Sequence, residues 1–529
     1  MRGKLLSATL CAALAAAAGA QDRPTEEELF GAPGETPRAE EKAPPPAVAP
    51  AQGGASHQDT EAELFGAQSP PSKAPVPAQG TLIPREKEDW LKVGGLLQLR
   101  AQMTSYEGSP PGDWPFSSPN LLDVYLDARP NDRVRGFVLG RMNYDPTVGT
   151  MGETGRGTIN NTGFGAAPTT QNPGAVLDQM WLNFDLYHVA FVTAGRQHVK
   201  WGVGKFWNPT DYLHPVKRNP LAPFDVRTGT TMVKLHVPWE KRGWNFYGIA
   251  LFEDLAGETA TDPTNRLGRI GIGGRAEIVL GGAELGLDGI AQNGHHPRYG
   301  IDLSTGLGDF DLYSELAIRY GGDDPHWVQE GPPPPPPIPP ELGGWVPETS
   351  NKVTPQLVVG GSWSYKYSDK DSFTIGVEYF YNQLGYSDPS AYPFLLLGAP
   401  TLATLPGQTE PSVVQQDPTA YQPFYVGKQY AAASLLLPKP GSWNDTNIVL
   451  STVGNLSDHS YLSRVDLSVL VLTYLTVETF AAVHYGQKGG EFRLVLPPEV
   501  AELPQAQTSA SFPTGAPVVD LGVGLRLSL

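Results

Sequence analysis

Hydrophobic and polar residues alternate with a period of two through most of the chain from Leu91 onward. The last segment shows the pattern most clearly. One of its faces carries Val519, Leu521, Val523, Leu525, Leu527 and Leu529, and the other carries Asp520, Gly522, Gly524, Arg526 and Ser528. Such alternation is typical of a β-strand with one apolar and one polar face. Each segment is about ten residues long, the length that a tilted strand needs to cross a bilayer.

The alternation predicts about 18 strands, and the protein is expected to be all-β. Their predicted spans are 91–103, 121–129, 133–144, 177–187, 189–197, 230–237, 244–253, 269–280, 283–292, 299–304, 310–320, 356–367, 373–384, 429–437, 446–454, 463–472, 475–485 and 518–529.

The lengths of the connections between these strands are sorted. Every connection after an even-numbered strand is short, whereas all the long ones follow odd-numbered strands: 104–120, 145–176, 198–229, 254–268, 321–355, 385–428 and 486–517. This sorting predicts a transmembrane antiparallel up-and-down barrel of 16–18 strands, with tight periplasmic turns on one rim and extracellular loops on the other. A large soluble all-β protein is the alternative, but it would not explain the sorting.

Aromatic residues on the predicted outward face also support a transmembrane barrel. Near the loop ends stand Tyr144, Phe252, Tyr299, Tyr320, Tyr381 and Tyr485, and near the turn ends stand Trp244, Phe310, Tyr367 and Phe373. Two rings of amphipathic aromatic residues are favoured at the two lipid–water interfaces of a membrane. The chain also ends on an apolar strand residue, Leu529, so the last strand is expected to be recognised by the barrel assembly machinery.

Composition narrows the class further. The 529 residues include 60 Gly and 52 Pro, and only 18% are charged, which favours strands and turns over helical bundles. The formal net charge of −17 argues against a nucleic-acid partner. Residues 1–20 resemble a secretory signal peptide, and the single cysteine, Cys11, lies within it. The mature chain would therefore have no disulfide or thiolate site, and no later apolar run is long enough for a membrane helix.

Residues 21–85 are rich in Pro, Ala, Gly and Glu and are predicted to be a disordered periplasmic tether that precedes a barrel at 86–529. An acidic stretch followed by Leu-Phe-Gly-Ala occurs twice, with Leu29 and Phe30 in the first copy and Leu64 and Phe65 in the second. This duplication is either a short motif that binds a periplasmic partner or a neutral tandem repeat.

Charged residues on the predicted inward face are the candidates for the lumen wall. They are Arg100, Arg133, Arg135, Arg141, Arg269, Arg275, Asp311, Glu315 and Glu378. Most of the inward arginines fall in the first eight strands, whereas strands nine to thirteen are mainly acidic, which predicts an electric field across the lumen. The alternative is that these groups pair between neighbouring strands and only satisfy the wall.

The 198–229 connection is basic in an otherwise acidic chain, and four prolines would stiffen it. Wide barrels select solutes by a loop that folds inward. The candidates for the constriction are Arg196, Lys200, Trp201, Lys205, Trp207, Asp211, Tyr212, Lys217, Arg218 and Arg227. An external surface loop is the alternative. The preceding strand, 189–197, alternates poorly, so the facing of Arg196 is left open.

Short motifs in and after this region resemble those of porin-like outer-membrane proteins of the alginate-export and phosphate-selective type. They are Gly195-Arg196-Gln197 with Trp201-Gly202, Asn208-Pro209 and Asp211, followed by 377–382 and 456–460. The resemblance implies passive, substrate-selective diffusion across the outer membrane, with lipid and lipopolysaccharide around the barrel. It also implies a homotrimer, although this chain has a proline-rich tether where the family has a helical extension.

These patterns predict a Gram-negative porin or ion channel for small hydrophilic or anionic solutes, such as sugar acids or phosphates. The alternative is a structural or adhesive barrel whose lumen is plugged by loops such as 385–428. No catalytic motif, cofactor site or metal site is predicted. The Gly271–Gly274 run precedes no helix, and His295-His296 has no third ligand nearby in the sequence.

Overall fold

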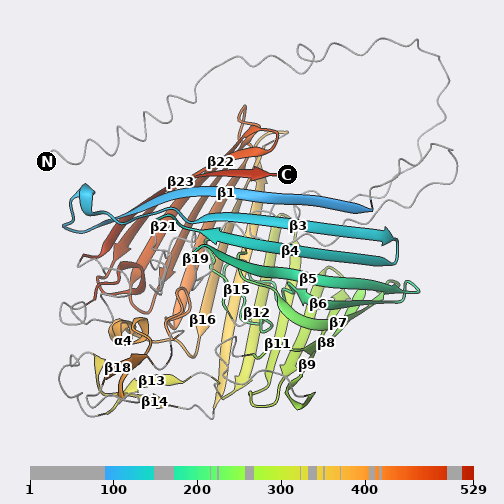
Figure 1. Ribbon diagram of the computed structural model, residues 1–529, viewed down its shortest axis with the longest axis horizontal. Coiled ribbons are helices and arrows are strands. Elements are labelled where there is room, and N and C mark those ends of the chain that lie inside the picture. The colour runs from blue at the N-terminus through green and yellow to red at the C-terminus, as the bar shows by residue number, and fades with distance from the viewer. Residues whose placement is uncertain are drawn as a thin grey trace, which may run out of the picture. The chain divides into compact units, whose positions relative to one another are not determined.

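The computed structural model describes residues 90–529 apart from 148–171, 215, 223–224, 256–266, 322, 324, 332–341, 349–351, 370, 404–411, 416, 418–419 and 497–514. Eighteen long strands form one ring (Figure 1). They are β1 (Leu91–Tyr106), β3 (Asn120–Asn131), β4 (Val134–Tyr144), β5 (Gly174–Leu186), β6 (Ala190–Gln197), β7 (Thr230–Trp239), β8 (Trp244–Leu251), β9 (Gly271–Leu280), β10 (Ala283–Ala291), β11 (Arg298–Leu307), β12 (Phe310–Tyr320), β15 (Val353–Lys366), β16 (Ser372–Asn382), β19 (Gln429–Pro438), β20 (Thr446–Asn455), β21 (Ser460–Leu472), β22 (Leu475–Gly486) and β23 (Pro517–Ser528).

Each strand pairs antiparallel with the next along the chain, and the last strand pairs with the first. In the closing pair, Leu97 of β1 lies opposite Leu527 of β23. Closure leaves no unpaired edge, which is the condition for a sheet to stand in a bilayer. The predicted fold class is confirmed, and all eighteen predicted strands are present with bounds shifted by a few residues.

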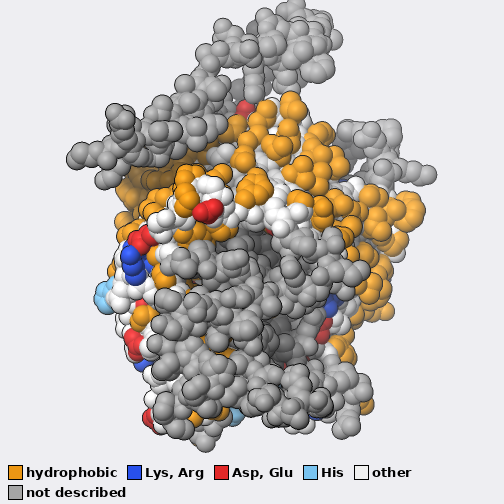
Figure 2. Space-filling view, turned by 60° about the vertical axis from the view of Figure 1, so that its left-hand side comes forward, with side chains coloured by type: hydrophobic (Ala, Val, Ile, Leu, Met, Phe, Trp, Pro, Cys, Tyr) orange, Lys and Arg blue, Asp and Glu red, His pale blue; other side chains and the backbone are white. Residues whose placement is uncertain are grey.

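The two faces of the wall differ as the alternation predicts. On β1, Leu97 and Leu99 are exposed on the outside, whereas Gln98 and Arg100 are buried on the inside. Hydrophobic side chains cover much of the described outer surface (Figure 2). A soluble sandwich would bury this apolar face against a second sheet. An apolar band around a closed barrel is instead the surface that lipid covers.

Aromatic side chains gather on the outer face near the turns. Phe310 and Trp363 lie across neighbouring strands with ring centroids 6.2 Å apart, and Trp363 also meets Phe373 edge-on at 5.8 Å. Trp239 and Trp244 pair in the same way at the β7–β8 turn, at 5.4 Å. This is the arrangement that the sequence predicts for one interface.

The long connections carry short elements of their own. These are η1 (Pro111–Asp113), β2 (Phe116–Ser117), η2 (Leu267–Arg269), the hairpin of β13 (His326–Gln329) and β14 (Trp345–Glu348), η4 (Pro389–Ala391), α4 (Tyr392–Leu396), the hairpin of β17 (Pro400–Ala403) and β18 (Ser412–Gln415), and η5 (Glu491–Arg493). No helix in the described part of the chain is long and apolar enough to cross a membrane.

Two of these loops share a hydrophobic core outside the strands. Trp327 of β13 meets Phe394 of α4 edge-on at 5.1 Å, and Trp345 of β14 stacks on the same ring at 5.4 Å. Leu395 and Leu397 are buried in the same cluster. The described parts of the 321–355 and 385–428 connections therefore pack against each other.

The predictions for the N-terminal region, namely the signal peptide (1–20), the tether (21–85) and the repeated motif with Leu29, Phe30, Leu64 and Phe65, lie outside the described residues.

Candidate functional site

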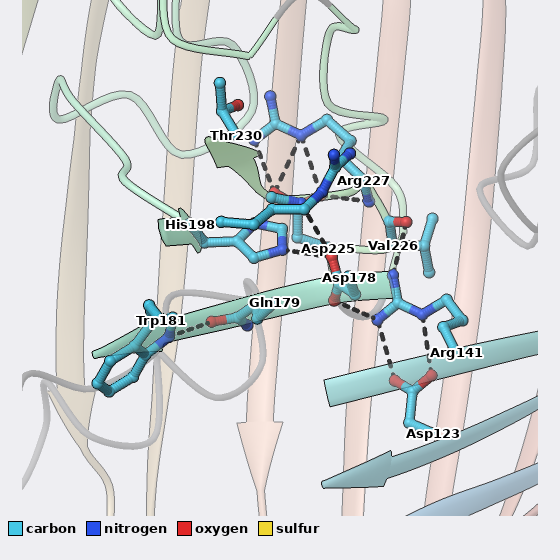
Figure 3. A network of polar contacts seen from close by, with 12 residues as sticks. Asp123, Arg141, Asp178, Gln179, Trp181, His198, Asp225, Val226, Arg227 and Thr230 are labelled. Carbon is cyan, nitrogen blue, oxygen red and sulfur yellow. Dashed lines mark hydrogen bonds and ion pairs between the residues drawn. The ribbon is translucent and has the colours of Figure 1, made fainter. Parts of the chain in front are cut away.

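The 198–229 loop, which joins β6 to β7, is fixed at its root by one carboxylate. Asp178 of β5 contacts Nε2 of His198 at 2.8 Å and accepts the backbone N–H of Gly229 at 3.0 Å (Figure 3). It therefore holds both ends of the loop. Arg141 of β4 lies 3.2 Å from Asp178 and donates to the backbone oxygen of Val226 at 2.8 Å.

The far part of the loop is held by a second carboxylate, Glu315 of β12. It accepts the backbone N–H groups of Val203 and Gly204, both at 3.0 Å, and that of Thr210 at 2.7 Å. The Thr210 hydroxyl adds a fourth bond at 2.8 Å. Glu315 is fully buried, so these donors replace the water that an ionised carboxylate would otherwise need.

A third carboxylate, Glu378 of β16, grips the next turn of the loop. It accepts the backbone N–H groups of Lys205 at 2.8 Å, Phe206 at 3.1 Å and Trp207 at 2.7 Å, and the hydroxyl of Tyr313 at 2.7 Å. The ring order makes β6 the fifth strand and β16 the thirteenth of eighteen. They are eight positions apart in a ring of eighteen strands, so the loop crosses the lumen between nearly opposite walls.

Two glycines let the loop wrap around these carboxylates. Gly202 has a positive φ of 84°, and a Cβ there would lie 2.4 Å from Oε2 of Glu315. A Cβ on Gly204 would lie 1.8 Å from the backbone oxygen of Trp207. Glycine is therefore required at positions 202 and 204 because other atoms approach the backbone closely there, and not only because glycine is flexible.

Aromatic packing fixes the tip of the loop against the wall. The Trp207 ring is fully buried and stacks on Phe380 of β16 with ring centroids 5.5 Å apart. Its indole N–H donates to the backbone oxygen of Phe424 at 2.9 Å. The tip is thus held between the barrel wall and the 385–428 loop, within an apolar cluster that extends to Phe492 beyond β22.

Two lysines of the loop have no partner among the described residues. The Lys200 side chain is exposed and that of Lys217 is partly exposed. Within the part of the chain that the structure describes, neither makes a hydrogen bond or an ion pair. Partial desolvation, with Arg319 nearby, lowers the pKa of Lys217 to about 7. Desolvation, with Arg218 nearby, also lowers the pKa of Lys200, to about 8.

The other loop residues predicted for the constriction already have partners or are buried. Arg227 pairs with Asp211 at 2.9 Å and with Asp225 at 2.6 Å, so its charge is compensated. Lys205 lies over the ring of Tyr313, 5.9 Å from its centroid. Three further candidates are buried: Trp201, Tyr212 and Arg218.

Arg196 lies outside the lumen, which settles the question that the sequence left open and corrects its place among the constriction candidates. It is the cross-strand partner of Met180, which is exposed on the outer face. Its guanidinium pairs with Glu253 at 3.1 Å, and Glu253 also accepts the Thr231 backbone N–H. Directly opposed residues of a sheet share a face, so Arg196 points outward at the loop rim.

The predicted wall arginines divide into two groups. Arg100, Arg135, Arg141 and Arg275 lie on inner faces of strands. Arg133 lies in the β3–β4 turn, where its guanidinium stands over the Tyr187 ring at 5.9 Å, and Arg269 lies in η2. The predicted strands begin too early at these two positions, because the alternation shows which face a residue would lie on but not where a strand begins.

Most of the predicted acidic wall is already compensated. Arg275 pairs with Asp288 at 2.9 Å and with Asp302 at 2.5 Å, whereas Glu315 and Glu378 bind loop amides. The remaining predicted acid, Asp311, is exposed near a turn, as is Glu284 of β10. The predicted field across the lumen is therefore weaker than the residue count implied, and pairing within the wall explains most of these charges.

Sequence reasoning missed what the carboxylates do. The sequence predicts Glu315 and Glu378 only as inward acids, and nothing local marks them, or Asp178, as anchors of a loop. The useful signal was the apolar character of nearby inward positions, such as Val358 and Phe380, because apolar lumen positions need something to cover them.

No protein-family model matches this chain, and no curated protein does. Among solved structures, the chain is similar to a triple mutant of the Rhodopseudomonas blastica porin, with 9% identity, 83% of this chain and 100% of that chain covered, and a TM-score of 0.36. It is also similar to Pseudomonas aeruginosa OpdK with vanillate, with 9% identity, 83% and 98% covered, and a TM-score of 0.44.

Proposed function

We propose that the protein is an outer-membrane channel for passive diffusion of small hydrophilic solutes, with a preference for anions, in which the 198–229 loop is the constriction. The observation that carries this proposal is the path of the loop across a closed barrel, with the ammonium groups of Lys200 and Lys217 unpaired among the residues that the structure describes. A fixed positive charge at a narrow point lowers the free energy of a passing anion and raises that of a cation.

The orientation follows from the two rims. Short turns face the periplasm and long loops face the outside, with the N-terminal tether on the periplasmic side. Lipid and lipopolysaccharide surround the apolar band, the assembly machinery recognises the C-terminal strand β23, and the protein forms a homotrimer. Transport through such a barrel requires no catalysis, so the protein is not an enzyme.

The test is ion selectivity of the refolded protein in planar bilayers under a salt gradient. At pH 6, where both ammonium groups are largely charged, the double substitution Lys200→Glu/Lys217→Glu changes the charge of the loop by about four units, since two positive groups become negative. We expect the zero-current potential to change sign. The matched control, Lys241→Glu/Lys439→Glu, makes the same change in two short turns and should leave the potential as it is.

A plugged barrel with a structural or adhesive role is the second candidate, and a specific observation favours it. The apolar cluster with Trp207, Phe424 and Phe492 fills part of the lumen, and the 385–428 loop helps to build it. An absence of ion conductance by the wild-type protein would refute the channel and favour this alternative. Deletion of residues 25–67 should then remove a co-purifying periplasmic partner.

A further inference from the structure

Six aromatic rings face the lumen on six consecutive strands, in the half of the barrel near the turns. They form two inner aromatic stacks. The first contains Tyr125 of β3, Phe137 of β4 and Trp181 of β5, with successive ring centroids 5.9 and 5.5 Å apart and interplanar angles of 23° and 25°. The second contains Phe191 of β6, His236 of β7 and Tyr247 of β8, at 5.8 and 4.6 Å and 30° and 12°.

The strand register fixes the direction of these rings. Phe137 and Trp181 are cross-strand partners, and His236 is the partner of both Phe191 and Tyr247. Directly opposed residues lie on the same face of a sheet. The chain neighbours Val138, Leu182 and Leu235 are exposed on the outer face, so the rings point inward. Trp181 lies below the root of the 198–229 loop, with its indole N–H on Gln179 at 3.2 Å (Figure 3).

All six rings are half-exposed, and none belongs to the buried clusters formed by the loops. Exposed aromatic surface in a water-filled lumen is unfavourable, at about 25 cal/mol per Å² of apolar area. A solute that covers these rings therefore gains free energy. Stacking between neighbouring strands also stabilises the sheet.

Polar groups around the stacks indicate the kind of solute. Arg135 lies over the Trp181 ring at 5.4 Å and pairs with Asp127 at 2.9 Å. In the second stack the Tyr247 hydroxyl donates to Glu277 at 3.2 Å, and His236 contacts Asn245 at 3.0 Å. Fixed donors and acceptors therefore stand beside both stacks.

The charges beside the stacks are paired and are not cations alone. Asp127 pairs with Arg129 at 3.1 Å and with Arg135 at 2.9 Å, and Glu277 pairs with Arg275 at 3.0 Å. Carboxylates accept hydrogen bonds from hydroxyl groups, and guanidinium and amide groups can donate to them. A ring with an apolar face and hydroxyl groups at its edge matches this combination better than an aromatic acid does. Sugars have this form.

We propose that the two inner aromatic stacks form a binding track for sugar rings below the constriction. This inference rests on the proposed channel, because the track is reached only through an open lumen. Each sugar lays an apolar face on an aromatic ring while its hydroxyls exchange hydrogen bonds with the flanking polar groups. Along β6, the partner of Trp181 (Gly195) and Phe191 are four residues apart, or about 13 Å, so the stacks form successive subsites.

The test is block of potassium chloride current through the wild-type channel by maltotriose. Sorbitol serves as the comparison, because it has hydroxyl groups but no ring. We expect saturable block by maltotriose and none by sorbitol at equal concentration. The substitutions Phe137→Ala/Trp181→Ala, and separately His236→Ala/Tyr247→Ala, should raise the half-blocking concentration at least tenfold. The control Trp363→Ala removes an outward tryptophan and should leave block unchanged.

The possible failures can be told apart. Normal salt current without block by maltotriose would overturn the sugar track and leave the channel proposal intact, whereas no salt current would refute the channel itself. Block by benzoate but not by maltotriose would assign the stacks to aromatic acids and overturn the inference. If a double variant does not fold, Trp181→Leu and Tyr247→Leu singly keep apolar volume without a ring face, and unchanged block in both would also overturn it.

Discussion

Removing the Glu378 carboxylate should release the tip of the 198–229 loop from the wall. In Glu378→Ala, three backbone N–H groups, those of Lys205, Phe206 and Trp207, and the Tyr313 hydroxyl lose their acceptor. A buried donor without a partner costs about 1–3 kcal/mol, so the loss could reach about 4–12 kcal/mol.

Water that enters from the lumen will satisfy some of these donors, so the expected loss is near the low end, about 4 kcal/mol. Each 1.4 kcal/mol is a factor of about ten, so the released population should rise about a thousandfold. A released tip widens the lumen and moves the lysines away from its axis. We therefore expect higher single-channel conductance, larger current noise and weaker anion preference.

Single-channel recording measures all three quantities, and the heat-dependent mobility of the barrel in detergent gels checks that the variant is folded. Glu284→Ala is the matched control, because it removes an inward glutamate that is exposed near a turn. A folded Glu378→Ala barrel with wild-type conductance and selectivity would refute the role of this carboxylate in positioning the constriction.

Three further predictions follow from single residues. Gly202→Ala should destabilise the docked loop and increase current noise in the same recordings, because its φ is positive and its Cβ would meet Glu315; quiet, unchanged channels would contradict the close approach. The pKa of Lys217 is lowered to about 7, so its charge is present below that pH and lost above it. Anion preference should therefore fall as pH rises from 6 to 8. The fall should be smaller in Lys217→Arg, in which only Lys200, with a pKa lowered to about 8, still loses charge in this range. A pH-independent wild type would argue against the role of these groups. Arg196→Ala should leave selectivity unchanged, since the side chain pairs with Glu253 on the outer face, and a shifted zero-current potential would place it in the pore.

The strands could be predicted because lipid imposes a period-two pattern on every segment that crosses the membrane. The pairing of the last strand with the first, in which Leu97 lies opposite Leu527, could be predicted once the number of strands was correct. The facing of Arg196 could not be predicted, because β6 has apolar residues or glycine on both faces near its end and the alternation fails there.

The inward path of the 198–229 loop could be proposed from its charge, but its anchors could not be identified. Glu378 is 171 residues from Trp207 in the chain, and it contacts backbone amides, which have no side-chain signature. The inner aromatic stacks were missed for a different reason. Phe137 and Trp181 lie within predicted strands, but the alternation shows only which face a residue lies on and not which residues lie opposite each other across strands.

The use of backbone donors at the tip has a consequence for how such a channel can diversify. Glu315 and Glu378 hold Val203, Lys205 and Phe206 by their amide groups, so most substitutions at these positions keep the anchoring bonds. Proline is the exception, because it lacks the N–H group. The side chains of the 198–229 loop can thus change, by mutation or by engineering, while the loop keeps its position in the lumen.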